Sequence, residues 1–326
     1  MGLILNKEKI FLFLAPLGLG LITFFVLIPY NAGDRIVYAA LYQSCAELSI
    51  LAGYGCYVGN ITTYEPFYYL IMLVGYELNL SHNFMMFLGN IFLIWAFLKF
   101  SYKNNINIYF AAFTVATNFY FWTLFTELER LKFCIGLFFW YQSSSKPFIN
   151  HKLGPLAALL AHMQIAVIAI PMFLFRANSP KLIHGKWVEI TSKSARMSSS
   201  VVLLLLIALL IYLQSEIFLS KFNRYFVLNK IDVSDVILAF AFFMFAITLL
   251  PKTVRNIAVF ASIFFASLLI GGARVNLMYF FAYYVISAPI RLSKNYGLLL
   301  LTFYFFFKTL IFMDNFITTG RGFNIE

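Results

Sequence analysis

A few charged side chains interrupt long apolar runs, and their types suit proton transfer and anion binding. His162 lies nine residues after Leu153 in an apolar run, so a helix there would place it about 13 Å along, near mid-span. A histidine with its ordinary near-neutral pKa suits general acid–base work. Arg274 follows two glycines and Arg130 belongs to a charged island, and a guanidinium binds phosphate through two contacts. These residue types would suit a general base, His162, and a binding site for an anionic ligand, formed by the arginines.

Each of these residues also has a simpler structural interpretation. His162 is equally compatible with a neutral histidine that is hydrogen-bonded to a neighbouring helix. Arg274 is compatible with a topology anchor that extends to the membrane interface. Arg130 is compatible with an ion pair to Glu127 or Glu129 that stabilises the island. The sequence leaves both interpretations open.

Two acidic residues near the N-terminal end add to the candidates. Asp34 and Tyr38 are four residues apart and share one helical face. Glu65 precedes Pro66, a helix start where an acidic side chain is favoured by the helix dipole. Capping therefore explains Glu65, whereas a role as general base or sugar ligand needs a partner from elsewhere in the chain.

The composition identifies the class of protein in which these residues must be positioned. The chain has 326 residues, of which 62% are apolar and 11% are charged, against about 45–50% and 25% in soluble domains. A soluble enzyme, a disordered chain, a coiled coil and a disulfide scaffold are excluded. The net charge of +11 is expected in loops that set membrane orientation, and no basic soluble face indicates nucleic acid as a partner.

The apolar runs predict an all-α, polytopic membrane protein with about 9–11 transmembrane or re-entrant helices in a single domain, 1–326. Residues 31–64 are expected to form an extracytoplasmic loop that lies partly on the membrane, and residues 176–198 a basic loop. The expected spans are Ile10–Tyr30, Pro66–Leu80, Phe84–Leu98, Ile106–Phe125, Leu153–Phe175, Val201–Leu219, Val236–Leu250, Val254–Ile270, Val275–Ile290 and Tyr296–Met313.

The orientation of these spans does not resolve from charge alone. Counting forward from a cytoplasmic N-terminus places the loop Arg176–Arg196 outside, whereas counting backward from Lys252 and Arg255 places it inside. The segment Leu131–Tyr141 is too short to cross a bilayer. A re-entrant or immersed segment between Leu131 and Lys152 is favoured over a basic loop on the outer face.

The three cysteines and the absent motifs narrow the chemistry. Cys45 and Cys56 share the expected outer loop, so a disulfide is compatible with the sequence, as are two free thiols. No cysteine or histidine spacing typical of a metal site occurs, and there is no P-loop, GxGxxG, HExxH or DxD motif. No metal or cofactor is expected.

The order of the polar motifs resembles the EpsG-like, Wzy-type polysaccharide polymerases of bacterial inner membranes. That family's stretches read approximately GxDxxxY, EPGF, RQ, a histidine with a small residue soon after, and an arginine near YF. This chain has Asp34-x-x-x-Tyr38, YEPFYYL at Tyr64–Leu70, Arg130, His162, and Arg274 with Tyr279-Phe280. It departs from the pattern at Phe67, Leu131, Met163 and Gln164.

The resemblance implies a GT-C-like glycosyltransferase that joins oligosaccharide repeat units carried on undecaprenyl pyrophosphate at the outer leaflet, for an O-antigen or an exopolysaccharide. His162 or Glu65 would act as base, and Arg274 and Arg130 would bind pyrophosphate. Asp34, Tyr38 and Tyr279 would contact substrate, and Arg224 would add a lipid-phosphate contact. The expected partners are the lipid-linked oligosaccharide and membrane lipids, with a chain-length regulator as a further candidate.

Two alternatives belong to other classes. A flippase or transporter of the same lipid-linked sugars would also place charges inside the membrane, although transporters usually contain repeated halves, and none is found here. A structural or accessory membrane subunit would not need His162 and Arg274 to converge. Elongation of a lipid-linked repeat unit by purified protein separates the enzyme from both.

Overall fold

A computed structural model describes residues 7–30, 32–61, 65–144, 154–162, 165–174, 180–183, 186–189, 233–270 and 272–320. The chain divides into two compact units. The first unit comprises Met1–Gln164 together with Ala288–Glu326, and the second comprises Ile165–Ser287. The N-terminal and C-terminal parts of the chain therefore belong to the same unit.

The first unit is helical throughout its described part. Its elements are α1 (Lys7–Leu27), α2 (Asp34–Ser44), α3 (Ile50–Ile61), α4 (Pro66–Glu77), α5 (His82–Lys103), α6 (Ile108–Thr117), α7 (Phe119–Thr126), α8 (Glu129–Ser143), α9 (Gly154–Ala161), the 3₁₀ turn η4 (Leu292–Lys294) and α16 (Tyr296–Thr319).

Three of the described helices, α1, α5 and α16, are long and apolar enough to cross a membrane. Helices α6 and α7 are apolar and are joined at Asn118 with a bend of 64°. If this bent pair is one membrane span, the described residues contain four spans. The Asn118 side chain accepts a hydrogen bond from the Tyr120 N–H and so starts the second helix. The expected span Ile106–Phe125 is therefore a broken helix, and the chain is a helical protein of membrane-spanning composition.

The long helices α1 and α5 run antiparallel. Gly20 lies against Ile91, and the Asn90 side chain donates a hydrogen bond of 2.9 Å to the Thr23 hydroxyl. At the far end, Arg35 binds both the Leu27 carbonyl of α1 and the side chain of Asn83 on α5. This pairing places the end of α1 and the start of α5 side by side.

Helix α8 is the buried centre of the first unit. Its 15 residues span about 22 Å, less than the roughly 30 Å hydrocarbon core of a bilayer, and nearly all of its side chains are buried. It packs closely on α5, with Gly89 facing Phe133 and Gly136 facing Phe92. The segment from Leu131 is thus short and enclosed by other helices, and its immersion in the membrane stays a prediction.

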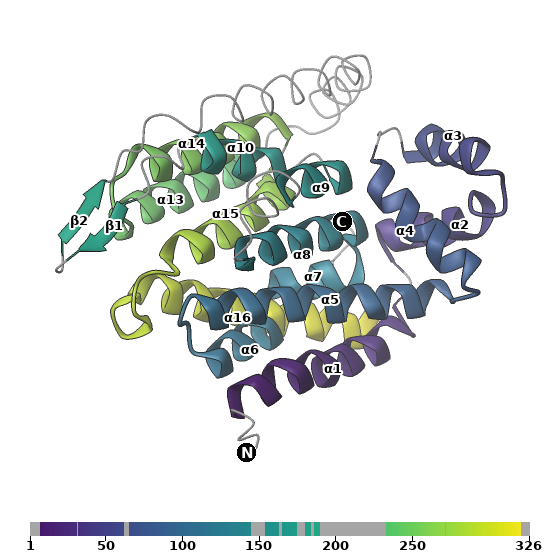
Figure 1. The fold of residues 1–326 in the computed structure, drawn as a ribbon, viewed down its shortest axis with the longest axis horizontal. Helices are drawn as coiled ribbons and strands as arrows, with labels where there is room; N and C mark the ends of the chain where they lie inside the picture. The colour runs from purple at the N-terminus through teal and green to yellow at the C-terminus, as the bar shows by residue number, and fades with distance from the viewer. Residues whose placement is uncertain are drawn as a thin grey trace, which may run out of the picture. The chain divides into compact units, whose positions relative to one another are not determined.

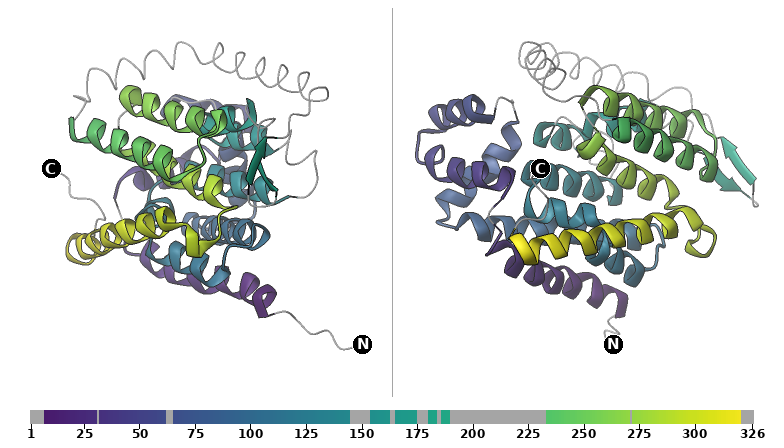
Figure 2. Two further views of the ribbon diagram at one scale, coloured as in Figure 1. Left: turned by 90° about the vertical axis from the view of Figure 1, so that its left-hand side faces the viewer. Right: turned by 180° about the vertical axis from the view of Figure 1, so that it is seen from behind.

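The short helices α2, α3 and α4 gather beyond the end of α1 and the start of α5 (Figures 1 and 2). A disulfide joins Cys45 to Cys56 within this group, which decides between the two states that the sequence allows. Tyr42 donates a hydrogen bond of 2.7 Å to the Leu80 carbonyl and so connects α2 to the chain just before α5. The expected outer loop is therefore a helical lobe.

Gly33 determines how the chain leaves α1 for α2. Its φ is +61°, and an added Cβ would lie 2.8 Å from the Glu127 carboxyl carbon. We expect Gly33→Ala to lower the free energy of unfolding by about 1–3 kcal/mol, because it adds backbone strain and a clash. Thermal unfolding in detergent micelles measures this change. Gly55→Ala is the control, since that glycine has open space around it, and an equal loss in both variants would contradict the prediction.

The second unit contains α10 (Ala166–Leu174), β1 (Pro180–Ile183), β2 (Lys186–Glu189), α13 (Val233–Leu249), α14 (Val254–Ile270) and α15 (Gly272–Ser287). The strands form an antiparallel hairpin with Pro180 opposite Glu189. This hairpin lies inside the expected basic loop and is an exception to the all-helical expectation. The expected span Val201–Leu219 lies outside the described residues.

Candidate functional site

The charged island before and within the first turn of α8 is the centre of a polar cluster inside the first unit. It contains Glu127, Glu129, Arg130 and Lys132, of which the last three are buried. Leaving charged groups in an apolar interior is costly unless each finds a partner. Each of the four side chains contacts a residue from another segment of the chain. The island therefore organises the site.

Arg130 binds two residues from different helices. Its Nη1 pairs with the Glu65 carboxylate just before α4, and its Nε donates a hydrogen bond of 2.6 Å to the Tyr38 hydroxyl of α2. The guanidinium also lies over the Tyr38 ring, 5.5 Å from its centroid. Glu65 is 1% exposed, so this is an enclosed ion pair and not a surface salt bridge.

His162 completes this first cluster. Its Nδ1 lies 2.6 Å from the second oxygen of Glu65. The expectation that His162 lies within a continuous helix is wrong, because α9 ends at Ala161 and His162 follows it directly. His162 thus stands at the end of α9, where its N–H donates to the Ala158 carbonyl, and its ring contacts Glu65, 97 residues earlier in the chain.

The carboxylate of Glu65 is held in its charged form by these two neighbours. Burial raises its pKa, but His162 and Arg130 together outweigh burial and bring the pKa down to about 2. For the Tyr38 phenol, burial raises the pKa, Arg130 opposes the rise and Asp34 adds to it. The first cluster thus holds a fixed negative charge between two potential cations.

The sequence-based alternatives for Arg130 and Glu65 are corrected by this geometry. Arg130 forms an ion pair with Glu65, which lies outside its own island. Glu127 instead accepts a hydrogen bond from the Tyr30 hydroxyl. Glu65 stands at the cap position of α4 but makes no side-chain capping bond. The packing of α4 against α8 has redirected both side chains away from their local partners.

The other predicted site residues are distributed over both units. Asp34 begins α2, one turn before Tyr38, in the first unit. Tyr279 is buried in α15 of the second unit, stacked on Phe260 at 6.1 Å between ring centroids. Arg274 lies in the first turn of α15, but its side chain lies outside the described part of the chain, as does all of Arg224. Their convergence with His162 stays a prediction.

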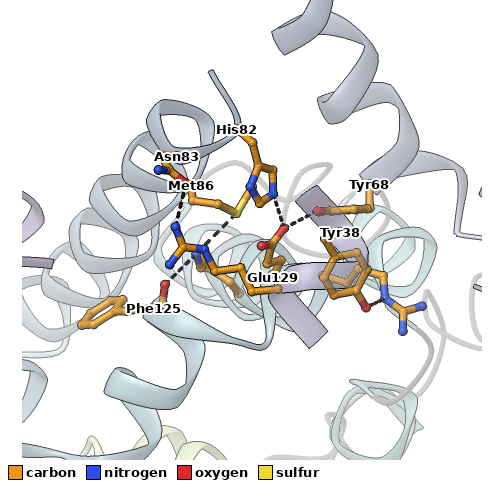
Figure 3. Close-up of polar contacts among 10 residues, drawn as sticks. Tyr38, Tyr68, His82, Asn83, Met86, Phe125 and Glu129 are labelled. Atoms are coloured by element: carbon orange, nitrogen blue, oxygen red, sulfur yellow. Dashed lines mark hydrogen bonds and ion pairs between the residues drawn. The ribbon is translucent and has the colours of Figure 1, made fainter. Parts of the chain in front are cut away.

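A second cluster, which the sequence did not indicate, lies next to Tyr38 of the first cluster (Figure 3). Glu129 accepts a hydrogen bond of 2.5 Å from the Tyr68 hydroxyl, and the same oxygen lies 3.1 Å from Nε2 of His82. The rings of Tyr68 and Tyr38 meet edge to face at 5.6 Å, so the two clusters share a wall. The available signal was that His82 belongs to the short polar break Ser81-His82-Asn83, where α5 begins.

Lys132 completes the island and is fully buried. Its Nζ lies 3.3 Å from the Phe125 carbonyl and 3.7 Å from the Met86 sulfur (Figure 3). Within the described residues, no group of three or more histidine, cysteine or acidic side chains is arranged to hold a metal ion. The ionisable groups of the two clusters are His82 and His162, Glu65 and Glu129, Arg130 and Lys132, together with the tyrosines, and such groups suit proton transfer and anion binding.

Comparisons with protein-family models, with curated proteins and with solved structures find no match to this chain.

Proposed function

We propose that this chain is a membrane glycosyltransferase that polymerises oligosaccharide repeat units carried on undecaprenyl pyrophosphate, in the inner membrane of a bacterium. The observation that carries the proposal is the cluster of Glu65, Arg130, His162 and Tyr38, which meet from four separate segments of an apolar protein. Burying such groups is costly, and side chains of this kind inside membrane proteins commonly serve function.

The residue types fit the reaction. The donor loses an anionic pyrophosphate lipid, and arginine stabilises that developing charge. The acceptor hydroxyl must lose its proton to a nearby base, for which histidine is suited. The proposed active site is therefore the pair of clusters at the start of α8.

The distribution of charge supports an active site at the outer face. Because α1 and α5 are antiparallel and Tyr30 stacks on Phe316 near the end of α16, the start of α1, the end of α5 and the start of α16 lie at one end of the first unit. Six basic residues lie on these helix ends or just outside them, Lys7, Lys9, Lys99, Lys103, Arg291 and Lys294, whereas Lys308 lies within α16. The positive-inside rule makes this end cytoplasmic. The disulfide-containing lobe and both clusters lie at the opposite end, where an oxidising compartment suits the disulfide.

The test is elongation by the purified protein. The protein is reconstituted in vesicles with a lipid-linked repeat unit, and the products are separated by chain length. We expect a ladder of products that carry two or more repeats. Movement of the repeat unit across the vesicle without elongation would indicate a flippase, and neither activity would indicate an accessory subunit; both results would overturn the proposal.

A further inference from the structure

The two clusters each contain a carboxylate beside a histidine, but the carboxylates have different surroundings. Both oxygens of Glu65 are engaged, one by Arg130 and one by His162. Glu129 forms no ion pair with an arginine or lysine among the described residues. Its partners are the Tyr68 hydroxyl and His82, both on one oxygen, and its other oxygen is buried without a hydrogen bond.

His82 has one nitrogen held and one nitrogen unpartnered. Nε2 lies 3.1 Å from the Glu129 carboxylate, which cannot donate when ionised, so Nε2 carries the proton and donates it. Nδ1 is then the lone-pair nitrogen, and it is buried without a hydrogen-bond partner. A carboxylate that fixes the tautomer of a histidine in this way leaves the opposite nitrogen ready to accept a proton.

When two titratable groups lie in contrasting environments, their roles in acid–base chemistry usually differ. A carboxylate locked between arginine and histidine is a poor proton acceptor, because accepting a proton breaks the ion pair. An unpartnered imidazole nitrogen breaks nothing when it accepts one. The contrast separates an anchoring pair, Glu65 with Arg130, from an acid–base pair, His82 with Glu129.

We propose that His82, oriented by Glu129, is the general base that removes the proton from the acceptor hydroxyl, and that Glu65 serves to anchor Arg130. This assignment rests on the proposed glycosyltransferase function and names a base other than Glu65 and His162. Tyr68 holds Glu129 in place from α4.

In the proposed transfer, one proton moves to His82 and one glycosidic bond replaces the bond to pyrophosphate. The acceptor O–H proton passes to Nδ1 of His82, and the oxygen forms a bond to the anomeric carbon of the donor. The bond from that carbon to the pyrophosphate oxygen breaks, and the pyrophosphate lipid leaves with the electron pair. The imidazolium that forms is stabilised by Glu129, and the proton is then released to the leaving group or to water.

The groups around His82 support this role from three helices. Tyr42 of α2 faces the imidazole at 5.5 Å between ring centroids, and Glu129 of α8 and Tyr68 of α4 complete the pair. The nearby cations are Arg35, whose guanidinium binds Asn83 next in the chain, and Lys132, one turn after Glu129. Nδ1 is shielded from solvent in the free protein, so the acceptor sugar reaches it only when the side chains that cover it move. Until the acceptor binds, bulk water is excluded from this nitrogen.

One test reads the tautomer directly and needs no activity. Protein labelled with ¹⁵N-histidine is reconstituted in nanodiscs, and the His82 signals are assigned by their loss in His82→Gln. At a pH where His82 is neutral, we expect the proton on Nε2 and an unprotonated Nδ1, and we expect Glu129→Gln to weaken that preference. A proton on Nδ1 in the wild-type protein would overturn the assignment.

The second test reads the rate. The variant His82→Gln keeps a hydrogen-bond donor toward Glu129 but has no basic nitrogen. We expect it to lower kcat for elongation by about 100-fold or more and to leave KM for the lipid-linked donor within about 3-fold of the wild-type value. We also expect it to abolish the limb of the pH–rate profile that rises with pH. Ser81→Ala is the matched control, because it removes the side-chain cap of α5 one residue earlier and should lower stability but not kcat.

The outcomes separate the two proposals. If the wild-type protein elongates and His82→Gln retains its rate and pH limb, the base assignment is overturned and the glycosyltransferase stands. If the wild-type protein moves the repeat unit without elongating it, the proposed function fails and the assignment of a base falls with it. If Ser81→Ala loses as much kcat as His82→Gln, the effect is structural and the assignment is overturned.

Discussion

Replacing Glu65 with glutamine is expected to lower the free energy of unfolding by about 3–5 kcal/mol. The glutamine keeps the shape of the side chain but leaves the buried Arg130 guanidinium without its counter-charge, and an unpaired buried charge is far more costly than a lost pair. Glu77→Gln is the matched control, because Glu77 lies at the exposed end of the same helix α4. Denaturant unfolding in micelles measures both variants.

The companion double variant sharpens this test. Removing both charges in Glu65→Gln with Arg130→Gln should cost less than the sum of the two single changes, since no lone charge is left buried. A loss below about 1 kcal/mol for Glu65→Gln, or strictly additive losses in the double variant, would show that the pair does not hold α4 against α8.

The same ion pair predicts how stability depends on acid. The pKa of Glu65 is lowered from 4.5 to about 2 in the folded protein. The contribution of the ionised Glu65 to the free energy of unfolding is therefore complete above pH 4.5 and is lost as the pH falls toward 2. The expected size is about 3 kcal/mol. Unfolding curves between these pH values should show this loss in the wild-type protein and not in Glu65→Gln; an identical slope in both would contradict the assignment.

Replacing Arg130 with lysine is expected to reduce elongation of the lipid-linked repeat unit by about 100-fold or more. Lysine keeps the charge, but its single nitrogen cannot bind Glu65 and Tyr38 with the fixed geometry of the guanidinium and still face a pyrophosphate. The rate of product formation per folded protein measures this effect. Because the charge is retained, the loss of stability should be smaller than in Glu65→Gln.

The control for this variant is Arg291→Lys, an exposed position beside η4 at the opposite end of the first unit. Its elongation rate should stay within about 2-fold of the wild-type rate, because surface positions away from a site contribute little. A lysine variant of Arg130 that keeps more than a third of the wild-type rate would remove Arg130 from the charge-stabilising role and leave it a structural residue.

Several features of this protein follow from its sequence without any structure. The composition excludes a soluble class, and the apolar runs predict α1, α5 and α16 close to their observed ranges. The spacing of Asp34 and Tyr38 on one face and the helix start at Pro66 are also local, since helix periodicity and capping depend on neighbours within a few residues. The short length of the segment after Leu131 similarly indicates an element that does not cross the membrane.

The partner of each buried charge was decided only by the tertiary structure. Arg130 has acidic neighbours within its own island, yet it pairs with Glu65, 65 residues earlier in the chain. His162 contacts the same carboxylate across 97 residues, and His82 meets Glu129 across 47 residues. Local sequence determined that this is a helical membrane protein with costly charges inside it. Which charges meet depends on how helices pack, because a buried ion is satisfied by whatever side chain the fold brings within about 3 Å.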